Sequence, residues 1–251
     1  MTTCEHLIRE LIEPAATAGR RIMDIRRDSL DVRIKTDGSP ITRADLESEN
    51  ILIAALTRIA PDIPIVSEET RPPPDIGTRF WLLDPLDGTK SFIDGAATFS
   101  INIGLIEAQK PILGLLHLPS LCITYLSCGT GTARRIDAKG SETSIHVRRP
   151  PPEGLTVLTS QHHADQARES RFWAGRTVVN RQGIGGACKF GLIAEGAADM
   201  YVRFGQTGEW DTAAGQAIVE AAGGTVACLD GSPLTYGKSR YLNTGFVVKG
   251  G

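Results

Sequence analysis

Three separate segments of the sequence place acidic side chains next to an apolar stretch. Glu68 and Glu69 follow IPIVS, Asp84 and Asp87 stand in DPLD after WLL, and Asp211 stands in EWDTAAG. If these segments converge, their carboxylates repel one another and cannot all stay ionised without a cation. Mg²⁺ suits carboxylate oxygens combined with a substrate phosphate. The acids together therefore predict a metal site that handles a phosphate.

The DPLDGT segment, residues 84–89, adds main-chain groups to this chemistry. Pro85 lacks a backbone N–H, so this turn is not expected to continue a sheet and can aim the Leu86 carbonyl and both aspartates to one side. Gly88 and Thr89 follow at the expected start of a helix or tight turn, where exposed backbone N–H groups can hold a phosphate. The Thr89 hydroxyl can hold a water molecule, which a metal can turn into a nucleophile near neutral pH.

Each segment, taken alone, also has a plain structural interpretation. D-P-x-D-G is ordinary turn chemistry, and an aspartate such as Asp211 before a helix is most often its N-cap. Glu68 and Glu69 alone can be a solvated strand end. Asp45 falls three residues after Thr42 and so completes a capping pattern at a helix start. Only the combination of segments favours a metal site.

The elements that must position these acids follow from periodicity. Apolar residues at helical spacing predict a first helix over residues 3–27, which Pro14 should kink or divide. A hairpin turning at residues 37–38 comes next, and a second helix should run from Thr42 to a stop at Pro61. IPIVS and RFWLLD are predicted strands that end in acids, and a run of strands is expected in FSINIGLIEAQKPILGLLHLPSLCITYLSC.

Three consecutive prolines in VRRPPPEG mark the best candidate domain boundary, because they force an extended linker. The sequence thus predicts an N-terminal α+β half over residues 1–147, a linker at 148–154 and a C-terminal α/β half over 155–251. The second half should contain a helix over 211–222, whose small residues AAG allow close approach to another backbone, and a last strand near 225–229. Alternation of strand and helix there indicates a layered α/β architecture.

The formal net charge of −2 gives no general affinity for nucleic acid or a membrane surface, so an anionic ligand needs a local site. No run is apolar enough to span a bilayer, and no signal peptide is recognisable. The five cysteines form no C-x-x-C pair. They are expected to be reduced, mostly buried thiols of a cytoplasmic protein rather than disulfides or a zinc site.

The combined motifs resemble the inositol monophosphatase superfamily of metal-dependent, lithium-sensitive phosphatases. That superfamily carries D-P-[IL]-D-G-T and W-D-x-A-A-G, which stand here at residues 84–89 and 210–215, and S-E-E, which stands at 67–69. Within the superfamily, the chain is most similar to the bacterial 3′(2′),5′-bisphosphate nucleotidases. The matches are Lys90 in D-G-T-K-x-F, D-x-S-P-x-T-x-A-D from residue 37, Ser160-x-x-His163, Lys189-Phe190 and Tyr201-x-Arg203-Phe204-Gly205.

The resemblance implies a sugar-phosphatase-like fold of alternating αβαβα layers, with the site between the two halves. It implies two or three Mg²⁺ ions per site, held by Glu68, Asp84, the Leu86 carbonyl, Asp87 and Asp211. Glu68 and Thr89 would position and activate a water molecule, and Asp45 would assist Thr89. The implied substrate contacts are Glu68, Asp87, Gly88, Thr89, Lys90, His163, Lys189, Arg203 and Asp211.

The implied reaction is hydrolysis of adenosine 3′,5′-bisphosphate, a by-product of sulfate assimilation, to AMP and phosphate. The implied partner is this small phosphate ester and no nucleic acid polymer. A homodimer is left open. The implied location is the cytoplasm, with peripheral attachment at the inner membrane also left open.

Three positions depart from the nucleotidase pattern. Nucleotidases usually carry Gly-Ser-Ser-x-Lys before the phenylalanine, and this chain has Gly186-Ala187 in place of both serines. Ser91 replaces an acid common after the lysine, and Gln206 replaces a proline common after R-F-G. These departures leave open an inositol-1-phosphate or broad sugar phosphatase. A non-catalytic module that binds phosphate esters is the alternative from another functional class.

Overall fold

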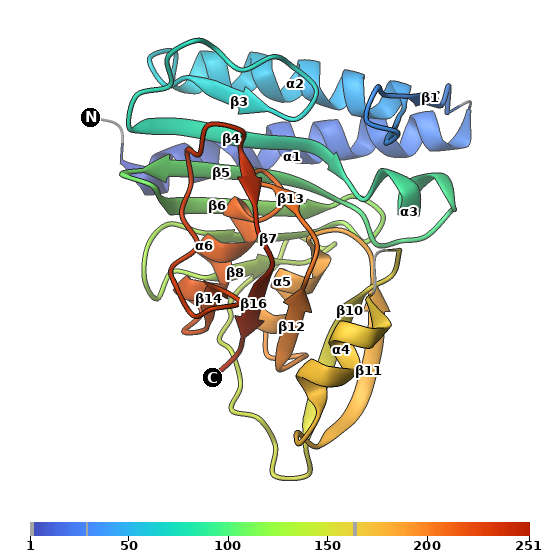
Figure 1. Cartoon of the computed structure of the whole chain (residues 1–251). Coiled ribbons are helices and arrows are strands. Elements are labelled where there is room, and N and C mark those ends of the chain that lie inside the picture. Colours follow the sequence, from blue (N-terminus) through green and yellow to red (C-terminus); the bar gives the residue numbers. More distant parts are fainter. Residues whose placement is uncertain (1–2, 29, 163–164) are drawn as a thin grey trace.

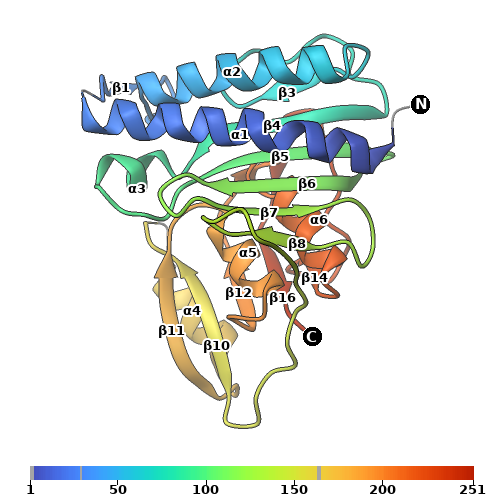
Figure 2. The same cartoon turned by 180° about the vertical axis from the view of Figure 1, so that it is seen from behind.

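The computed structural model describes residues 3–28, 30–162 and 165–251. Its layers follow the order helix, sheet, helix, sheet, helix (Figure 1). Helices α1 (Cys4–Arg27) and α2 (Arg43–Ile59) cover one face of a seven-stranded sheet. Helices α5 (Cys188–Ala194) and α6 (Ala213–Ala221) lie between this sheet and a five-stranded one, whose far face carries α4 (Gln166–Trp173) (Figure 2). The predicted αβαβα layers are confirmed.

The seven-stranded sheet has the order β3-β4-β5-β6-β7-β8-β9. Only the β3–β4 pair is parallel, so most of this sheet is an antiparallel meander. Its strands are β3 (Ile65–Ser67), β4 (Arg79–Asp87), β5 (Ser100–Glu107), β6 (Lys110–Leu118), β7 (Ile123–Ser127), β8 (Arg134–Ile136) and β9 (Glu142–Ser144).

The five-stranded sheet has the order β11-β10-β12-β16-β14. Strand β10 is parallel to both neighbours, and β16 is antiparallel to both of its own. The strands are β10 (Leu155–Ser160), β11 (Val178–Ile184), β12 (Met200–Arg203), β14 (Thr225–Cys228) and β16 (Phe246–Lys249). Two short hairpins, β1 (Arg33–Ile34) with β2 (Pro40–Ile41) and β13 (Thr207–Gly208) with β15 (Leu242–Asn243), and the short helix α3 (Thr89–Ile93) complete the described elements.

Strands β4 to β7 of the first sheet are largely buried on both faces, which explains their long apolar runs. Along β4, Trp81 and Leu83 pack toward α1 and α2, whereas Phe80 and Leu82 pack toward α5 and α6. Side chains alternate between the faces of a strand. Asp84, the next even-numbered residue, therefore lies on the face that looks toward α6.

Glycines let α6 lie directly on the first sheet. A Cβ on Gly104 of β5 would lie 2.8 Å from the Cβ of Ala213, and one on Gly114 of β6 would lie 2.3 Å from the carbonyl oxygen of Ala214. The close approach expected from the small residues at the start of α6 is therefore confirmed. It brings the segment that carries Asp211 against the same sheet whose strand β4 carries Asp84 and Asp87.

Several details differ from the predictions. Of the two outcomes predicted for Pro14, division of the helix does not occur, because Pro14 lies inside one helix. Strand β14 is not the last strand, because β16 follows and takes a place between β12 and β14. That pairing is between distant segments, and no local pattern in the sequence announces it.

The prediction of reduced, mostly buried cysteines is wrong in part. Cys4 and Cys128 form a disulfide that joins the start of α1 to the end of β7. They lie 124 residues apart in sequence, and only the fold brings their Cα atoms to 5.8 Å. Of the free cysteines, Cys188 is buried and Cys122 is exposed. Among the described residues, no helix combines the length and apolar character needed to cross a membrane.

His117 on β6 gives the fold a predictable response to acid. Its ring is 6% exposed, shares a 2.9 Å hydrogen bond with the Thr124 hydroxyl, and lies where a Cβ on Gly19 of α1 would come within 2.5 Å. Burial lowers the pKa of His117 to about 4, and Arg20 adds to the shift. An unfolded histidine titrates near pH 6.5, so only the unfolded state takes up a proton just below that pH. Stability from the neutral ring is thus present above pH 6.5 and lost toward pH 4, by up to about 3 kcal/mol.

We expect His117→Asn to reduce this acid sensitivity. Between pH 7 and pH 4.5, the loss of unfolding free energy should be smaller than in the wild type by about 2 kcal/mol, measured by urea unfolding. His6→Asn, at an exposed histidine of α1, should keep the wild-type pH dependence. An unchanged pH dependence in His117→Asn would contradict the assignment.

Candidate active site

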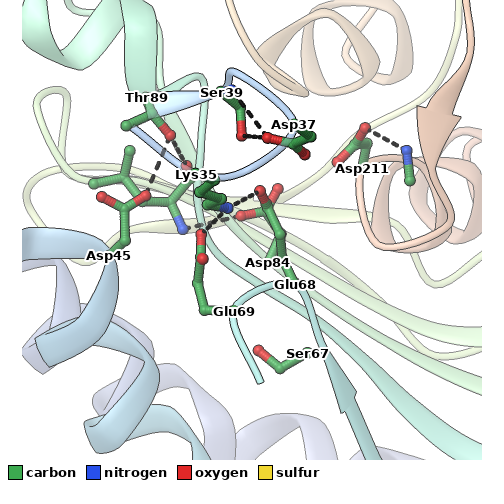
Figure 3. A network of polar contacts seen from close by, with 12 residues as sticks. Lys35, Asp37, Ser39, Asp45, Ser67, Glu68, Glu69, Asp84, Thr89 and Asp211 are labelled. Atoms are coloured by element: carbon green, nitrogen blue, oxygen red, sulfur yellow. Dashed lines mark hydrogen bonds and ion pairs between the residues drawn. The ribbon is translucent and has the colours of Figure 1, made fainter. Parts of the chain in front are cut away.

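The predicted acids meet where four elements end or begin. Glu68 directly follows β3, Asp84 and Asp87 lie at the end of β4, and Thr89 begins α3. Asp211 lies between β13 and α6, and comes to the group from the opposite side (Figure 3). Segments far apart in the sequence thus form one site between the first sheet and α6.

A β-bulge puts both aspartates of DPLD on the same face of the sheet. Asp84 pairs with Asn102 and Asp87 with Ser100, so three steps along β4 oppose two steps along β5. Residues three apart in a regular strand point to opposite faces, and one extra residue reverses that outcome. The expectation that Pro85 ends the sheet is therefore wrong. Strand β4 continues through Pro85, and the bulge directs both aspartates to one face, as the turn was expected to do.

Three carboxylates come close enough to share a cation. One ligand oxygen from each of Glu68, Asp84 and Asp211 lies within 4.8 Å of the others. Burial raises the pKa of Asp84 well above its usual range, and the charge of Glu68 raises it further. Burial also raises the pKa of Asp211, with Asp87 and Glu68 adding to the shift. The three carboxylates therefore repel one another when they are ionised, and a bound cation would relieve this repulsion.

The donor set fits Mg²⁺. Asp84 is 1% exposed, and its Oδ2 atom has no hydrogen-bond partner among the described residues. A buried carboxylate oxygen without a partner is costly, and a hard divalent cation that takes oxygen ligands would satisfy it. Asp87 stands beside this trio, accepts a 3.3 Å hydrogen bond from Asn102, and has its pKa raised by burial although Lys189 opposes the shift.

Lys35 is a site residue that sequence reasoning missed. Its ammonium lies 2.8 Å from Glu68 and 2.6 Å from Glu69, so it already offsets part of the negative charge (Figure 3). Burial alone would lower the pKa of Lys35, but the two glutamates raise it instead. The signal was its position in the β1–β2 hairpin, two residues before Asp37 of the D-x-S-P motif.

Asp45 serves two purposes with its two oxygens. Oδ2 accepts hydrogen bonds from the Thr42 backbone N–H at 2.8 Å and the Thr42 hydroxyl at 2.6 Å, which makes the predicted capping box of α2. Oδ1 accepts from the Thr89 hydroxyl at 3.2 Å. The same hydroxyl is 3.2 Å from the Leu86 carbonyl oxygen. The cap and the contact with Thr89 therefore coexist.

Asp211 is not a helix cap. Thr212 occupies the N-cap position of α6, and Asp211 instead accepts a 2.8 Å hydrogen bond from the Gly208 N–H. Glu209, two residues before Asp211, is fully buried and accepts hydrogen bonds from the backbone N–H groups of Gly237 at 2.7 Å and Lys238 at 3.0 Å. These bonds tie the turn that carries Asp211 to the C-terminal part of the chain.

A cavity of about 250 Å³ opens beside the acids. Its lining includes every predicted substrate-contact residue that the structure describes, namely Glu68, Asp87, Gly88, Thr89, Lys90, Lys189, Arg203 and Asp211. Asp45, Asp84 and Leu86 are buried and are not part of its lining. Residues from the separate sequence motifs therefore line one cavity.

Lys189 lines the cavity from a buried position and also contacts main-chain carbonyls. It is 4% exposed, and its ammonium donates to the carbonyl oxygens of Ile184 at 2.9 Å and Gly186 at 2.5 Å. Burial lowers the pKa of Lys189 to about 8, with Asp87 opposing the shift. Its ammonium therefore holds the loop before α5, where Gly186 adopts a φ of 54° against Asp87.

Among the described residues, His162 lines the cavity and shares a 3.1 Å hydrogen bond with the Ser91 hydroxyl. The predicted His163 lies outside the described residues. Arg203, at the same wall, donates to the Ser160 hydroxyl at 3.3 Å.

Comparison with known proteins agrees with this geometry. The sequence model of the inositol monophosphatase family matches residues 4–247. The 3′(2′),5′-bisphosphate nucleotidase CysQ of Shigella flexneri is 39% identical in an alignment 250 residues long that covers 96% of this chain and 99% of that one. The CysQ of Haemophilus influenzae is 34% identical in an alignment 259 residues long that covers 100% of this chain and 95% of that one.

The fold matches solved structures as well. The crystal structure of CysQ from Bacteroides thetaiotaomicron, a bacterial member of the inositol monophosphatase family, aligns with a TM-score of 0.83. Its sequence is 28% identical, and the alignment covers 96% of each chain. The chain described here belongs to the inositol monophosphatase family.

Proposed function

We propose that the chain is a Mg²⁺-dependent phosphomonoesterase that hydrolyses adenosine 3′,5′-bisphosphate to AMP and phosphate. The observation that carries the proposal is the trio Glu68, Asp84 and Asp211 within 4.8 Å, at the edge of a cavity whose other wall holds basic side chains. The curated relatives named bisphosphate nucleotidase, which match over nearly the whole chain, support the choice of substrate.

Glu68, Asp84, Asp87, Asp211 and the Leu86 carbonyl would hold the metal, with two or three Mg²⁺ ions per site. Bound Mg²⁺ would neutralise the phosphate and make a nearby water molecule more acidic. The protein supplies little covalent chemistry to phosphoryl transfer, and positioning with charge stabilisation provides most of the rate.

Thr89 and Glu68 would orient the attacking water. The Thr89 hydroxyl donates its proton toward Asp45 or the Leu86 carbonyl, so its lone pairs are left to accept a hydrogen bond from water in the cavity. Glu68 lies beside the same space and would accept a proton from that water. Asp45 would orient the Thr89 hydroxyl through Oδ1, the oxygen that takes no part in the helix cap.

Arg203 and Lys90 would bind the second phosphate of the substrate. Both line the cavity, and a guanidinium offers paired donors to a phosphate. Lys189 would act indirectly, because its ammonium is committed to the carbonyls of Ile184 and Gly186. The loop at 185–187 would then approach the substrate with main chain rather than with serine hydroxyls.

The test is phosphate release with Mg²⁺ from adenosine 3′,5′-bisphosphate and from inositol 1-phosphate, with and without lithium. We expect preference for the nucleotide and inhibition by lithium. Preference for inositol 1-phosphate would mean that Gly186-Ala187 sets a different specificity and would support the sugar phosphatase alternative. Binding of either ester without phosphate release would support the binding module.

Removing the Thr89 hydroxyl should lower kcat with little change in KM. In Thr89→Ala we expect a fall in kcat of about 10²-fold, because water positioning and proton transfer contribute on this scale. Asp45→Asn should show a smaller fall in kcat. Thr17→Ala, at an exposed threonine of α1, serves as control in the same phosphate-release assay. Wild-type kcat in Thr89→Ala would contradict the role.

The location in the cytoplasm and the homodimer stay predictions. The division into residues 1–147, 148–154 and 155–251 also stays a prediction, and limited proteolysis of the linker would test it.

A further inference from the structure

Helix α2 carries a buried polar row that touches each of the N-terminal site segments. Asp45 contacts Thr89, and the Ser48 hydroxyl donates to the Pro85 carbonyl at 2.8 Å. Glu49 lies on the same side of the helix, one residue further along. The row is buried, with Asp45 1%, Ser48 0% and Glu49 5% exposed. An amphipathic helix normally turns apolar residues to the core, so three polar residues there call for a specific reason.

Glu49 holds both ends of the segment that contains the two site glutamates. Its Oε1 atom accepts a hydrogen bond from the Ser67 hydroxyl at 2.5 Å, and its Oε2 atom accepts one from the Thr70 hydroxyl at 3.0 Å. Ser67 directly precedes Glu68, and Thr70 directly follows Glu69. No ion pair of Glu49 is found among the described residues. A buried carboxylate satisfied only by hydroxyls is costly to keep.

The alternation of side chains along β3 explains how the hydrogen bonds of Glu49 affect Glu68. Val66 packs toward α5 and α6, Ser67 turns to α2, and Glu68 returns to the side of the carboxylate trio. Figure 3 shows the Ser67 side chain lying apart from the carboxylates of Glu68 and Asp84. Fixing Ser67 on one face of the strand therefore fixes Glu68 on the other.

We propose that Glu49 is a positioning residue that sets the carboxylate of Glu68 for metal binding through Ser67 and Thr70. This inference rests on the proposed function for its biological meaning. It makes a separate claim about Mg²⁺ affinity, which can be measured without substrate. Partners that orient metal-binding side chains typically change metal affinity by about 10- to 100-fold when they are lost.

Titration calorimetry with Mg²⁺ alone tests the proposal on the wild type, Glu49→Ala, Glu49→Gln and Glu47→Ala. Glu49→Ala should weaken Mg²⁺ binding by about 10- to 100-fold. Glu49→Gln keeps an acceptor and the shape, so it should restore binding to within about threefold of the wild type. Glu47 lies on the same helix but pairs with Arg21 at the surface, so Glu47→Ala should bind Mg²⁺ normally.

Two results would overturn the proposal. Normal Mg²⁺ affinity in Glu49→Ala, with only a lower Tm, would make Glu49 a packing residue. Equal losses in Glu49→Gln and Glu49→Ala would show that negative charge acts, not position. If Glu49→Ala does not fold, Ser67→Ala replaces it, with a loss of about 10-fold expected and normal affinity again overturning the proposal. A wild type that binds Mg²⁺ but releases no phosphate would refute the proposed function and leave this test intact.

Discussion

Replacing Asp84 with asparagine should abolish Mg²⁺-dependent phosphate release and at the same time stabilise the metal-free protein. Asp84 is 1% exposed and lies within 4.8 Å of the carboxylates of Glu68 and Asp211. A metal contributes several kcal/mol of charge stabilisation in the transition state, so its loss corresponds to a fall of at least about 10³-fold in kcat/KM. In the absence of metal, the neutral amide removes one member of a repelling buried group and should add about 1–3 kcal/mol to the unfolding free energy.

Three measurements on Asp84→Asn check this pair of effects. They are phosphate release, Mg²⁺ titration, and urea unfolding with chelator at pH 8, where the wild-type carboxylates are under the strongest pressure to ionise. Asp62→Asn, at an exposed turn after α2, is the matched control and should change none of them. Wild-type Mg²⁺ affinity in Asp84→Asn would remove Asp84 from the metal site. If Asp84→Asn is less stable than the wild type in chelator, repulsion among the acids does not destabilise the metal-free fold.

Gly114→Ala should strongly destabilise the fold. The added Cβ would lie 2.3 Å from the Ala214 carbonyl oxygen and 2.9 Å from the Ala217 Cβ. Backbone cannot swing aside as a side chain can, so α6 must move away from β6. Overpacking usually costs about 1–3 kcal/mol, and a clash with backbone in a buried layer should reach about 3–5 kcal/mol. Because Asp211 precedes α6, Mg²⁺ affinity should fall as well.

Gly183→Ala is the control for this substitution. Gly183 also lies within a strand, but its nearest neighbour to an added Cβ is 4.0 Å away, at Gln161 Cα. Urea unfolding should show little change in that variant. A loss of less than about 1 kcal/mol in Gly114→Ala would mean that α6 can shift freely, and the argument for close packing would fail.

Much of the fold could be read from local patterns. Thr42 and Asp45 mark the start of α2 as a capping box, and the structure has that box. The apolar runs IPIVS and RFWLLD predict β3 and β4, because buried strands read as continuous apolar stretches. The place of β16 between β12 and β14 and the disulfide between Cys4 and Cys128 were not predictable in this way, since each joins segments that only the complete fold brings together.

In the candidate site, too, local motifs could be predicted from the sequence and long-range contacts could not. Its acids stand in short motifs with chemistry that can be recognised one segment at a time. Lys35 and Glu49 stand in no such motif, and their roles depend on which side chains lie opposite them. The alternatives for Asp45 illustrate the limit, because the choice between cap and contact with Thr89 disappears once its two oxygens are seen to have different partners.

The bulge in β4 explains why the two aspartates are separated by two residues rather than by one. A shorter D-x-D arrangement in a regular strand would also put both carboxylates on one face. It would, however, return the intervening carbonyl to the ladder with β5. In this chain the Pro85 carbonyl accepts from Ser48, and the Leu86 carbonyl faces the Thr89 hydroxyl. The motif length is therefore dictated by the main chain, and a design that copied only the acids would reproduce their direction while losing the carbonyl oxygens.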